Sequence, residues 1–211
     1  MRLKKVKNAK EIVENSEYYV NYPENLRGKW QEFFQNNHEI HIEIGMGKGK
    51  FIIEMAKANP DINFIGIEKY DSVMVKAIHM LEKMEPLPNL KLILIDAEKI
   101  GDIFDKEIDK IYLNFSDPWP KSRHEKRRLT SENFLKRYEN IFKGRKEIIQ
   151  KTDNKDFFDY SCESLKNYGY LIDTITYDLY AEHDVSNVPT EYEEKFNSRG
   201  VKINRLKAHK D

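Results

Sequence analysis

Short apolar runs alternate with amphipathic segments along most of the chain. Runs rich in Ile, Leu and Phe predict strands at 39–44, 62–67, 90–95, 110–115 and 146–151. Apolar residues at helical spacing predict helices at 48–58, 71–84, 97–104, 131–142 and 154–167. Two further strand-like runs, 171–180 and 201–207, have only a loop and a short helix between them, so we expect them to pair antiparallel. The alternation predicts an α/β fold, with a doubly wound, mostly parallel, Rossmann-like sheet and an antiparallel last strand.

Residues 1–38 precede this alternation, and their pattern predicts an N-terminal helical extension. Trp30, Phe33 and Phe34 supply the apolar face of a helix expected over Leu26–Gln35. Residues 39–211 contain no repeat, low-complexity tract or linker that would divide them. Because 211 residues is the size of one domain, we expect a single domain overall.

A glycine-rich turn joins the first predicted strand to the helix after it, with glycines at positions 45, 47 and 49. Such glycines let a ligand approach the backbone closely. Position 50 is Lys, so the turn lacks the third glycine of a dinucleotide fingerprint, and it also lacks the Gly-Lys-Ser/Thr of a phosphate loop. Three alternate glycines with Glu43 two residues ahead are typical of a turn that binds S-adenosylmethionine. Taken alone, the triplet also fits an ordinary tight turn.

Acidic residues stand at the ends of four successive predicted strands: Glu43, Glu68, Asp96 and Asp117. S-adenosylmethionine carries a sulfonium and an ammonium but no phosphate, so an acidic lining suits it. Glu68 has the position of an acid that accepts both ribose hydroxyls, and Asp96 could accept from an adenine amino group. Each acid by itself is more often a turn residue or a helix cap. Together, behind the glycine turn, the four predict a cofactor site at the carboxyl edge of the sheet.

The segment 116–128, Ser-Asp-Pro-Trp-Pro-Lys-Ser-Arg-His-Glu-Lys-Arg-Arg, follows the fourth predicted strand. It places a carboxylate, Asp117, and an indole, Trp119, beside a cluster of cations. The carboxylate and the ring suit a planar polar group, and the cations suit a polyanion, which favours a nucleic acid base held together with its backbone. By itself a charge run is as often a solvated loop. Trp119 either stacks on a base or only anchors its turn between two prolines.

Composition narrows the function classes further. With 36 Lys and Arg against 36 Asp and Glu the formal net charge is zero, so any nucleic acid contact must be local. The single cysteine, Cys162, excludes a disulfide within the chain and fits a reducing compartment. The start of the chain lacks the apolar core of a signal peptide and no run approaches a membrane span, so we expect a cytoplasmic protein without membrane contact. The histidines lack metal-ligand spacing, and we predict no metal.

Several of these motifs together resemble the bacterial tRNA (guanine-N7-)-methyltransferases, which methylate guanosine 46 in the tRNA variable loop with S-adenosylmethionine. The most specific is Ser116-Asp-Pro-Trp-Pro-Lys121 with its basic tail. Glu43-Ile-Gly-Met-Gly-Lys-Gly49, Lys151-Thr-Asp-Asn154 and Thr190-Glu-Tyr-Glu193 also match. The resemblance implies a class I methyltransferase sheet, S-adenosylmethionine as cofactor and tRNA as partner, and leaves monomer or homodimer open. The chain departs from the arginine-rich start of the family, with Lys4, Lys5, Lys7 and Lys10 in its place.

The resemblance also implies roles for the matching residues. Asp117 would be catalytic. The cofactor would be bound by Glu43, Gly45, Gly47, Gly49, Glu68, Asp96 and Asp117. The substrate would be held by Lys121, Asp153, Thr190, Glu191, Tyr192 and Glu193. The RNA would lie on Arg123, His124, Glu125, Lys126, Arg127 and Arg128.

The chemistry of such a reaction agrees with these residue types. Guanine N7 carries a lone pair and no proton, so its attack on a methyl group needs no base, and catalysis reduces to alignment and to stabilising positive charge. Asp117, Asp153 and Glu193 are the candidate carboxylates that accept from the guanine edge. Thr190 and Glu193 also form the pattern of a helix capping box, and Asp153 could cap the helix after it; these interpretations are compatible with substrate binding.

Three rival functions remain. A nicotinamide-dependent oxidoreductase would explain the sheet and Glu68 but not Lys50 in the glycine turn. A non-catalytic RNA-binding module would explain the basic segment but not four acids at strand ends. A methyltransferase acting on another RNA, a protein or a small molecule is the nearest alternative, and the cations of 121–128 disfavour the last two substrates.

Overall fold

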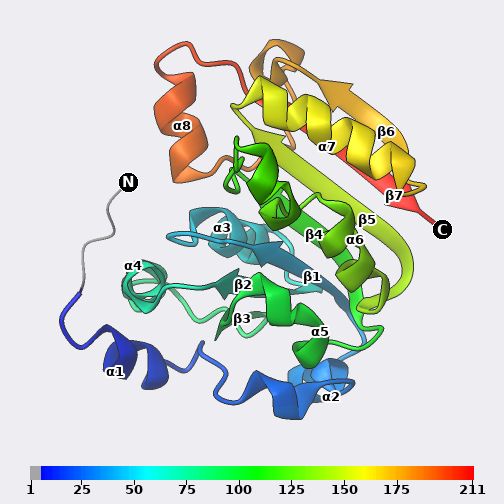
Figure 1. Ribbon diagram of the computed structural model, residues 1–211. Coiled ribbons are helices and arrows are strands. Elements are labelled where there is room, and N and C mark those ends of the chain that lie inside the picture. Colours follow the sequence, from blue (N-terminus) through cyan, green and yellow to red (C-terminus); the bar gives the residue numbers. More distant parts are fainter. Residues whose placement is uncertain (1–5) are drawn as a thin grey trace.

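A seven-stranded sheet runs through the computed structural model, which describes residues 6–211 (Figure 1). The strands are β1 Glu39–Ile44, β2 Ile62–Glu68, β3 Leu90–Leu94, β4 Ile108–Asn114, β5 Phe142–Thr152, β6 Leu171–Thr176 and β7 Asn204–Lys210. Their spatial order is β3-β2-β1-β4-β5-β7-β6. The first five are parallel, and β7 lies antiparallel between β5 and β6. The predicted doubly wound, mostly parallel sheet and the antiparallel pairing of the last two strands are confirmed.

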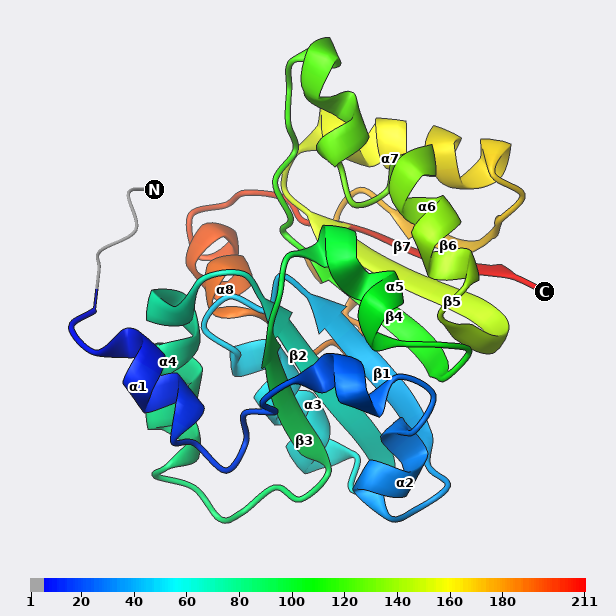
Figure 2. The same cartoon turned by 60° about the horizontal axis from the view of Figure 1, so that its bottom comes forward.

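Helices cover both faces of the sheet (Figures 1 and 2). The α-helices are α1 Ala9–Glu14, α2 Trp30–Phe34, α3 Lys50–Ala58, α4 Asp71–Leu81, α5 Ile100–Ile103, α6 Glu132–Glu139, α7 Lys155–Asn167 and α8 Glu191–Asn197. Short 3-10 segments are η1 Pro23–Leu26, η2 Ala97–Lys99, η3 Ser122–Arg127 and η4 Leu179–Glu182. None of the helices within residues 6–211 is long and apolar enough to cross a membrane.

Two hydrophobic cores lie on the two faces of the sheet. The first packs side chains of β1 and β4, such as Ile42 and Leu113, against α2, α5, α6 and α7. The second packs Phe64 and Leu92 against α1, α3 and α4. Successive strand residues enter opposite cores because side chains alternate across a strand. The central strands are nearly continuous apolar runs because helices cover both faces of the sheet.

The N-terminal segment packs against the sheet rather than standing away from it. The backbone N–H of Val20 donates to the carbonyl of Leu92 in β3 at 3.0 Å, and the Leu92 N–H donates to the carbonyl of Tyr18 at 2.8 Å. Trp30 is fully buried, and its indole N–H donates to the carbonyl of Ile103 at 3.0 Å. The division into an extension of residues 1–38 and a domain of residues 39–211 stays a prediction. Lys4 and Lys5 lie outside the described residues.

The helix predicted over Leu26–Gln35 is wrong in extent. A 3-10 turn ends at Leu26, and α2 begins only at Trp30. Between them Gly28 has a φ of 77°, which a continuous helix does not permit. The buried carboxylate of Glu107 accepts from the N–H groups of Gly28 and Trp30 at 2.9 and 2.8 Å, and so fixes this break from a distant part of the chain.

The bounds of the last two strands also differ from the prediction. The strand expected at 171–180 ends at Thr176, because the chain there turns into η4 and the hydroxyl of Thr176 accepts from the N–H of Asp178 at 3.1 Å. The strand expected at 201–207 is Asn204–Lys210, whose register is fixed by pairing along β5 from Thr152 to Lys146.

The strand order reverses between β1 and β4. Chain connections lead from β1 outward to β2 and β3, and then return across the sheet to β4 and β5. At such a switch point the two loops that follow the neighbouring strands diverge and leave a crevice at the carboxyl edge, which is where open α/β sheets bind ligands. The glycine turn and the Asp117 segment are the loops on its two sides.

Candidate active site

Four acids follow one another along the carboxyl edge in the spatial order of the strands: Asp96 after β3, Glu68 in β2, Glu43 in β1 and Asp117 after β4. The fold therefore brings together the residues that the sequence placed at strand ends. Their charges act on one another, since Glu68 contributes to raising the pKa of Glu43 and Asp117 contributes to raising that of Glu68. The edge is an acidic rim that favours a cationic ligand and disfavours a phosphate.

The glycine turn lies between β1 and α3. Gly49 precedes the first residue of α3 with a φ of 83°, and a Cβ atom there would lie 2.7 Å from the Cβ of Ala77 in α4. Gly47 also has a positive φ, 59°, and its N–H donates to Oε2 of Glu68 at 3.0 Å. The turn is thus fixed by close helix packing on one side and by an acid of the neighbouring strand on the other.

Glu68 is the most heavily hydrogen-bonded acid of the edge. Besides Gly47, its carboxylate accepts from the N–H groups of Lys69 and Tyr70 at 2.7 and 3.1 Å. Burial raises its pKa, and these three donors oppose the rise. Asp96 caps η2 by accepting from the N–H of Glu98 at 3.0 Å, and it also pairs with Lys69 at 2.5 Å. The roles of Glu68 and Asp96 in cofactor binding stay predictions.

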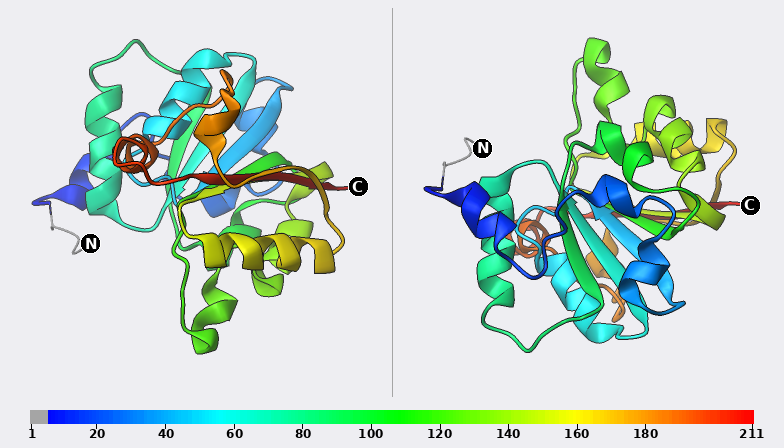
Figure 3. Two further views of the ribbon diagram at one scale, coloured as in Figure 1. Left: turned by 90° about the horizontal axis from the view of Figure 1, so that it is seen from above. Right: turned by 90° about the horizontal axis from the view of Figure 1, so that it is seen from below.

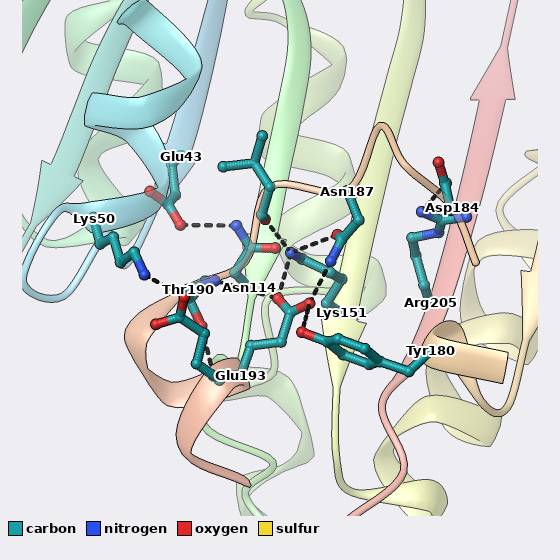
Figure 4. Close-up of polar contacts among 12 residues, drawn as sticks. Glu43, Lys50, Asn114, Lys151, Tyr180, Asp184, Asn187, Thr190, Glu193 and Arg205 are labelled. Carbon is teal, nitrogen blue, oxygen red and sulfur yellow. Dashed lines mark hydrogen bonds and ion pairs between the residues drawn. The ribbon is translucent and has the colours of Figure 1, made fainter. Parts of the chain in front are cut away.

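Glu43 forms a buried pair with Asn114 of β4 (Figure 4). The Asn114 side-chain amide donates to Oε1 of Glu43 at 2.8 Å. Among the described residues, Oε2 of Glu43 and Oδ1 of Asn114 have no hydrogen-bond partner although both are buried. Burial raises the pKa of Glu43 to about 7, against the opposing effect of the Asn114 amide. Sequence reasoning missed Asn114, whose signal is that it interrupts the apolar run of its strand.

Asp117 lies on the turn after β4 and is exposed. The backbone takes a positive φ on either side of it, 52° at Phe115 and 40° at Trp119. Arg128 secures this turn, since its Nε donates to the carbonyl of Pro118 at 3.0 Å and its Nη2 to that of Trp119 at 3.1 Å. The turn is therefore held open to solvent in a conformation that the local sequence alone does not favour.

The basic segment forms η3, which projects from the body of the molecule beside α6 and α7 (Figure 2). Arg127 lies over the ring of Trp119 with its Cζ 4.9 Å from the centroid, and His124 meets the same ring edge-on. Trp119 therefore contacts its own loop, and whether it also stacks on a base stays open. His124 is half-buried. The exposed side chains of the segment form what we call the basic surface: Lys121, Arg123, Glu125, Lys126 and Arg127.

Arg128 differs from the rest of the basic segment. Besides its two bonds to carbonyls, its guanidinium lies 4.1 Å from the ring centroid of Tyr160 in α7. The side chain is half-buried, and its Nε and Nη2 donate within the protein. Its position supports the turn that carries Asp117, and the RNA contact proposed for it remains untested.

A capping box begins α8, as the sequence pattern predicted. The Thr190 hydroxyl accepts from the N–H of Glu193 at 2.9 Å, and the Glu193 carboxylate accepts from the N–H of Thr190 at 3.3 Å. The same carboxylate is fully buried and pairs with Nζ of Lys151 at 2.5 Å (Figure 4). It also accepts from the Tyr180 hydroxyl at 3.2 Å and the Asn187 amide at 2.7 Å.

These four donors match the four lone-pair sites of a carboxylate, so Glu193 is saturated within the protein. Its contact with substrate remains a prediction, and its position here is that of an internal anchor. Sequence reasoning missed the partner, Lys151, because a lysine at a strand end gives no sign of burial. Burial lowers the pKa of Lys151, and Glu193 opposes that shift.

Ion pairs join α8 to the glycine turn and to the start of α3. Glu191 pairs with Lys48 at 2.8 Å and Glu194 with Lys50 at 2.5 Å. The hydroxyl of Tyr192 donates to Asp153 at 3.0 Å, just beyond β5. Burial and the charge of Asp153 raise the pKa of Tyr192 to about 12. The predicted substrate residues of α8 are thereby brought to the same edge as Asp117 and the cofactor acids.

Within residues 6–211 no group of three or more His, Cys, Asp or Glu side chains is arranged to hold a metal ion. What the carboxyl edge offers instead is a set of buried and exposed carboxylates beside a projecting basic surface. Such an arrangement can bind an organic cation next to a polyanion.

Comparisons with known proteins show the family and the fold of the chain. A family model described as a putative methyltransferase matches residues 37–206. A tRNA (guanine-N(7)-)-methyltransferase of Lachnoclostridium phytofermentans is 49% identical over 213 residues, covering 100% of this chain and 99% of that protein. One of Bacillus cytotoxicus is 52% identical over 198 residues, covering 93% and 91% of the two chains. Among solved structures, an antibiotic-related methyltransferase has a TM-score of 0.65 at 18% identity, covering 90% of this chain and 95% of its own.

The sheet order and the similarity to solved methyltransferases show the class I methyltransferase fold. The family model over residues 37–206 places the chain among the methyltransferases. Within that class, the chain belongs to the tRNA (guanine-N7-)-methyltransferase family, since its relatives are about half identical to it over nearly their whole length. The resemblance inferred from the motifs is confirmed.

Proposed function

We propose that this protein transfers a methyl group from S-adenosylmethionine to N7 of guanosine 46 in the tRNA variable loop. The observation that carries the proposal is the position of four acids along the carboxyl edge, at the switch point of the sheet, beside the exposed cations of the segment that forms η3. Its relatives are named for methylation of guanine N7 in tRNA, and position 46 in the variable loop is what the resemblance to the family implies.

The residues of the carboxyl edge fit the cofactor. Buried Oε2 of Glu43 and Oδ1 of Asn114 lack partners among the described residues, and unpaired buried acceptors suit an ammonium or sulfonium. Glu68 and Asp96 are the residues proposed for ribose and adenine, and the positive φ of Gly47 keeps the turn open for close approach. When bound, S-adenosylmethionine supplies an electrophilic methyl group.

On the substrate side, the protein has to orient guanine and stabilise a cation. N7 attacks with its own lone pair, so no general base is required, and the purine ring gains positive charge as the bond forms. Asp117 is exposed at the carboxyl edge, and Asp153, just beyond the neighbouring strand β5, accepts a hydrogen bond from the Tyr192 hydroxyl. We assign two roles to the carboxylate of Asp117: it accepts hydrogen bonds from the guanine edge, and it stabilises this charge. Asp153 is a second acceptor.

The experiment is methyl transfer to a defined tRNA. The protein is incubated with methyl-labelled S-adenosylmethionine and an unmodified tRNA, and the labelled nucleotide is then located. A matched tRNA with 7-deazaguanosine at position 46 lacks only the attacking nitrogen, so it should receive no label. Transfer to the 7-deaza tRNA, or no transfer to either RNA, would overturn the proposal. Ribosomal RNA in a parallel reaction tests the alternative RNA substrate.

The proposed reaction also bears on location and assembly. Because tRNA is modified in the cytoplasm, we place the protein there, and the lone Cys162 accords with a reducing compartment. A monomer and a homodimer remain the two proposed states, and sedimentation equilibrium of the free protein and of its tRNA complex distinguishes them.

A further inference from the structure

Three aromatic side chains form a row that starts at the strand end beside Asp117. The ring centroids of Phe115 and Tyr192 are 4.9 Å apart with planes at 41°, and those of Tyr192 and Phe196 are 4.1 Å apart with planes at 17°. Tyr192 and Phe196 are four residues apart on α8 and therefore share one face of that helix. We refer to Phe115, Tyr192 and Phe196 as the aromatic row.

The row is not part of either hydrophobic core. None of its members belongs to the two buried clusters or to the side chains packed against them. Tyr192 is 41% exposed, and Phe115 and Phe196 are half-buried. Three adjoining rings at the surface, outside the core, are more than folding requires.

Cations flank the outer end of the row. Nζ of Lys195 lies 5.9 Å and Cζ of Arg199 lies 5.8 Å from the ring centroid of Phe196. Both side chains are exposed, and neither forms an ion pair within residues 6–211. The acids of the same helix, in contrast, are all paired: Glu191 with Lys48, Glu194 with Lys50 and Glu193 with Lys151. The outer end of α8 therefore presents unpaired positive charge beside aromatic rings.

The row lies across the carboxyl edge from η3. Viewed along the sheet, α8 and η3 stand on opposite sides of it, and the ends of the parallel strands lie between them (Figure 3). An RNA strand that reaches Asp117 from the basic surface of η3 would meet Phe115 and then α8. Rings interleaved with unpaired cations are the features that proteins use to bind single-stranded nucleic acid.

We propose that the aromatic row, with Lys195 and Arg199, is a second RNA-contact surface that holds an unpaired nucleotide next to the target guanosine. The base packs against the rings, and the phosphate lies on the two cations. The occupant is a single-stranded RNA segment, and the proposal rests on the proposed function, tRNA methylation.

The test uses variants of the full chain that separate stacking from charge. Phe196→Leu keeps an apolar side chain on α8 but removes the aromatic face, and Phe196→Trp restores one. The double variant Lys195→Gln/Arg199→Gln removes only the charges. Lys57→Gln is the matched control. Lys57 is exposed, has no ion-pair partner among residues 6–211, and lies at the end of α3, towards the opposite edge of the sheet.

For Phe196→Leu we expect KM for tRNA to rise by roughly 5- to 100-fold, the effect of losing one base stack, with kcat at saturating tRNA and cofactor affinity unchanged. Phe196→Trp should restore KM. The charge variant should make the slope of log affinity against log salt shallower by about one to two units. A tRNA with 2-aminopurine beside position 46 should show fluorescence quenching that Phe196→Leu abolishes.

Two results would overturn the inference while leaving the proposed function intact. In one, the wild type methylates tRNA and all variants keep its KM and salt slope. In the other, Phe196→Leu lowers kcat at unchanged KM, so that the row supports α8 rather than RNA. If the wild type itself transfers no methyl group to tRNA, the proposed function fails instead, and the two failures are therefore distinguishable. Circular dichroism melts of each variant check that α8 and the fold are retained.

Discussion

Replacing Lys151 by Met tests the internal anchor of α8. Its Nζ pairs with Glu193 at 2.5 Å, and donates to the carbonyl of Val188 at 2.8 Å and to Oδ1 of Asn187 at 3.3 Å. The two paired side chains are 3% and 0% exposed. Met preserves the length and apolar stem of Lys151 but removes the charge, so Glu193 is left as a buried carboxylate without its cation.

The expected loss in the free energy of unfolding is large for a single substitution. Removing one partner of a buried ion pair costs about 3–5 kcal/mol. Glu193 keeps three donors, from Tyr180, Asn187 and Thr190, so we expect the lower end, about 3 kcal/mol. For a chain of this length, each kcal/mol lowers the melting temperature by about 2–4 °C, which gives a shift of roughly 6–12 °C.

Chemical denaturation measures the loss, and hydrogen exchange locates it. If the pair holds α8 locally, the amides of residues 191–197 exchange faster in Lys151→Met even where the rest of the chain is protected. The control is Lys50→Met, since Lys50 pairs with Glu194 of the same helix at the same 2.5 Å but is 30% exposed, with its partner 50% exposed. We expect less than about 1 kcal/mol from this exposed pair.

A double-mutant cycle with Glu193→Gln separates the pair from its surroundings. Lys151→Met in the Glu193→Gln background should cost less than in the wild type, with a coupling of about 0.5–3 kcal/mol. The reasoning is refuted if Lys151→Met unfolds at the wild-type denaturant concentration with unchanged exchange in α8. It is also refuted if Lys50→Met costs as much.

Three further predictions concern the acids of the carboxyl edge. Asp117→Ala should lower kcat by about two orders of magnitude or more with the fold intact. Asp117→Asn should be no better, because an amide supplies no charge to a developing cation. Activity near that of the wild type would exclude Asp117 from the reaction. Glu68→Ala should weaken S-adenosylmethionine and S-adenosylhomocysteine alike, by about tenfold to several hundredfold, and calorimetry with both ligands checks this. Burial raises the pKa of Glu43 from 4.5 to about 7. Between these two values the folded state retains a proton that the unfolded chain has lost. The free energy of unfolding therefore falls by about 3 kcal/mol as pH rises through this interval. Glu43→Gln should flatten this dependence in unfolding measured from pH 4 to pH 8, and an unchanged profile would contradict the assignment.

The sequence by itself determined the features whose causes are local. Strands and helices followed from the spacing of apolar side chains, and the capping box of α8 from Thr190 and Glu193 being three residues apart. The acids at strand ends also followed, since parallel strands separated by helices must end at one edge of the sheet. For the elements and the cap, residue type and short spacing were enough, because the interactions lie within a few residues of one another. The acids are far apart in the chain, and their common edge followed from the alternation of strands and helices.

Tertiary structure decided which of these polar side chains are exposed and what they contact. Glu43 and Asn114 are 71 residues apart, and Lys151 and Glu193 are 42 apart, so no local pattern shows which residue each of them pairs with. The break at Gly28 was mispredicted for the same reason, since its N–H is bound by Glu107 across 79 residues. Burial changes the cost of a charge by several kcal/mol, and only the path of the whole chain determines which charges are buried and which partners reach them.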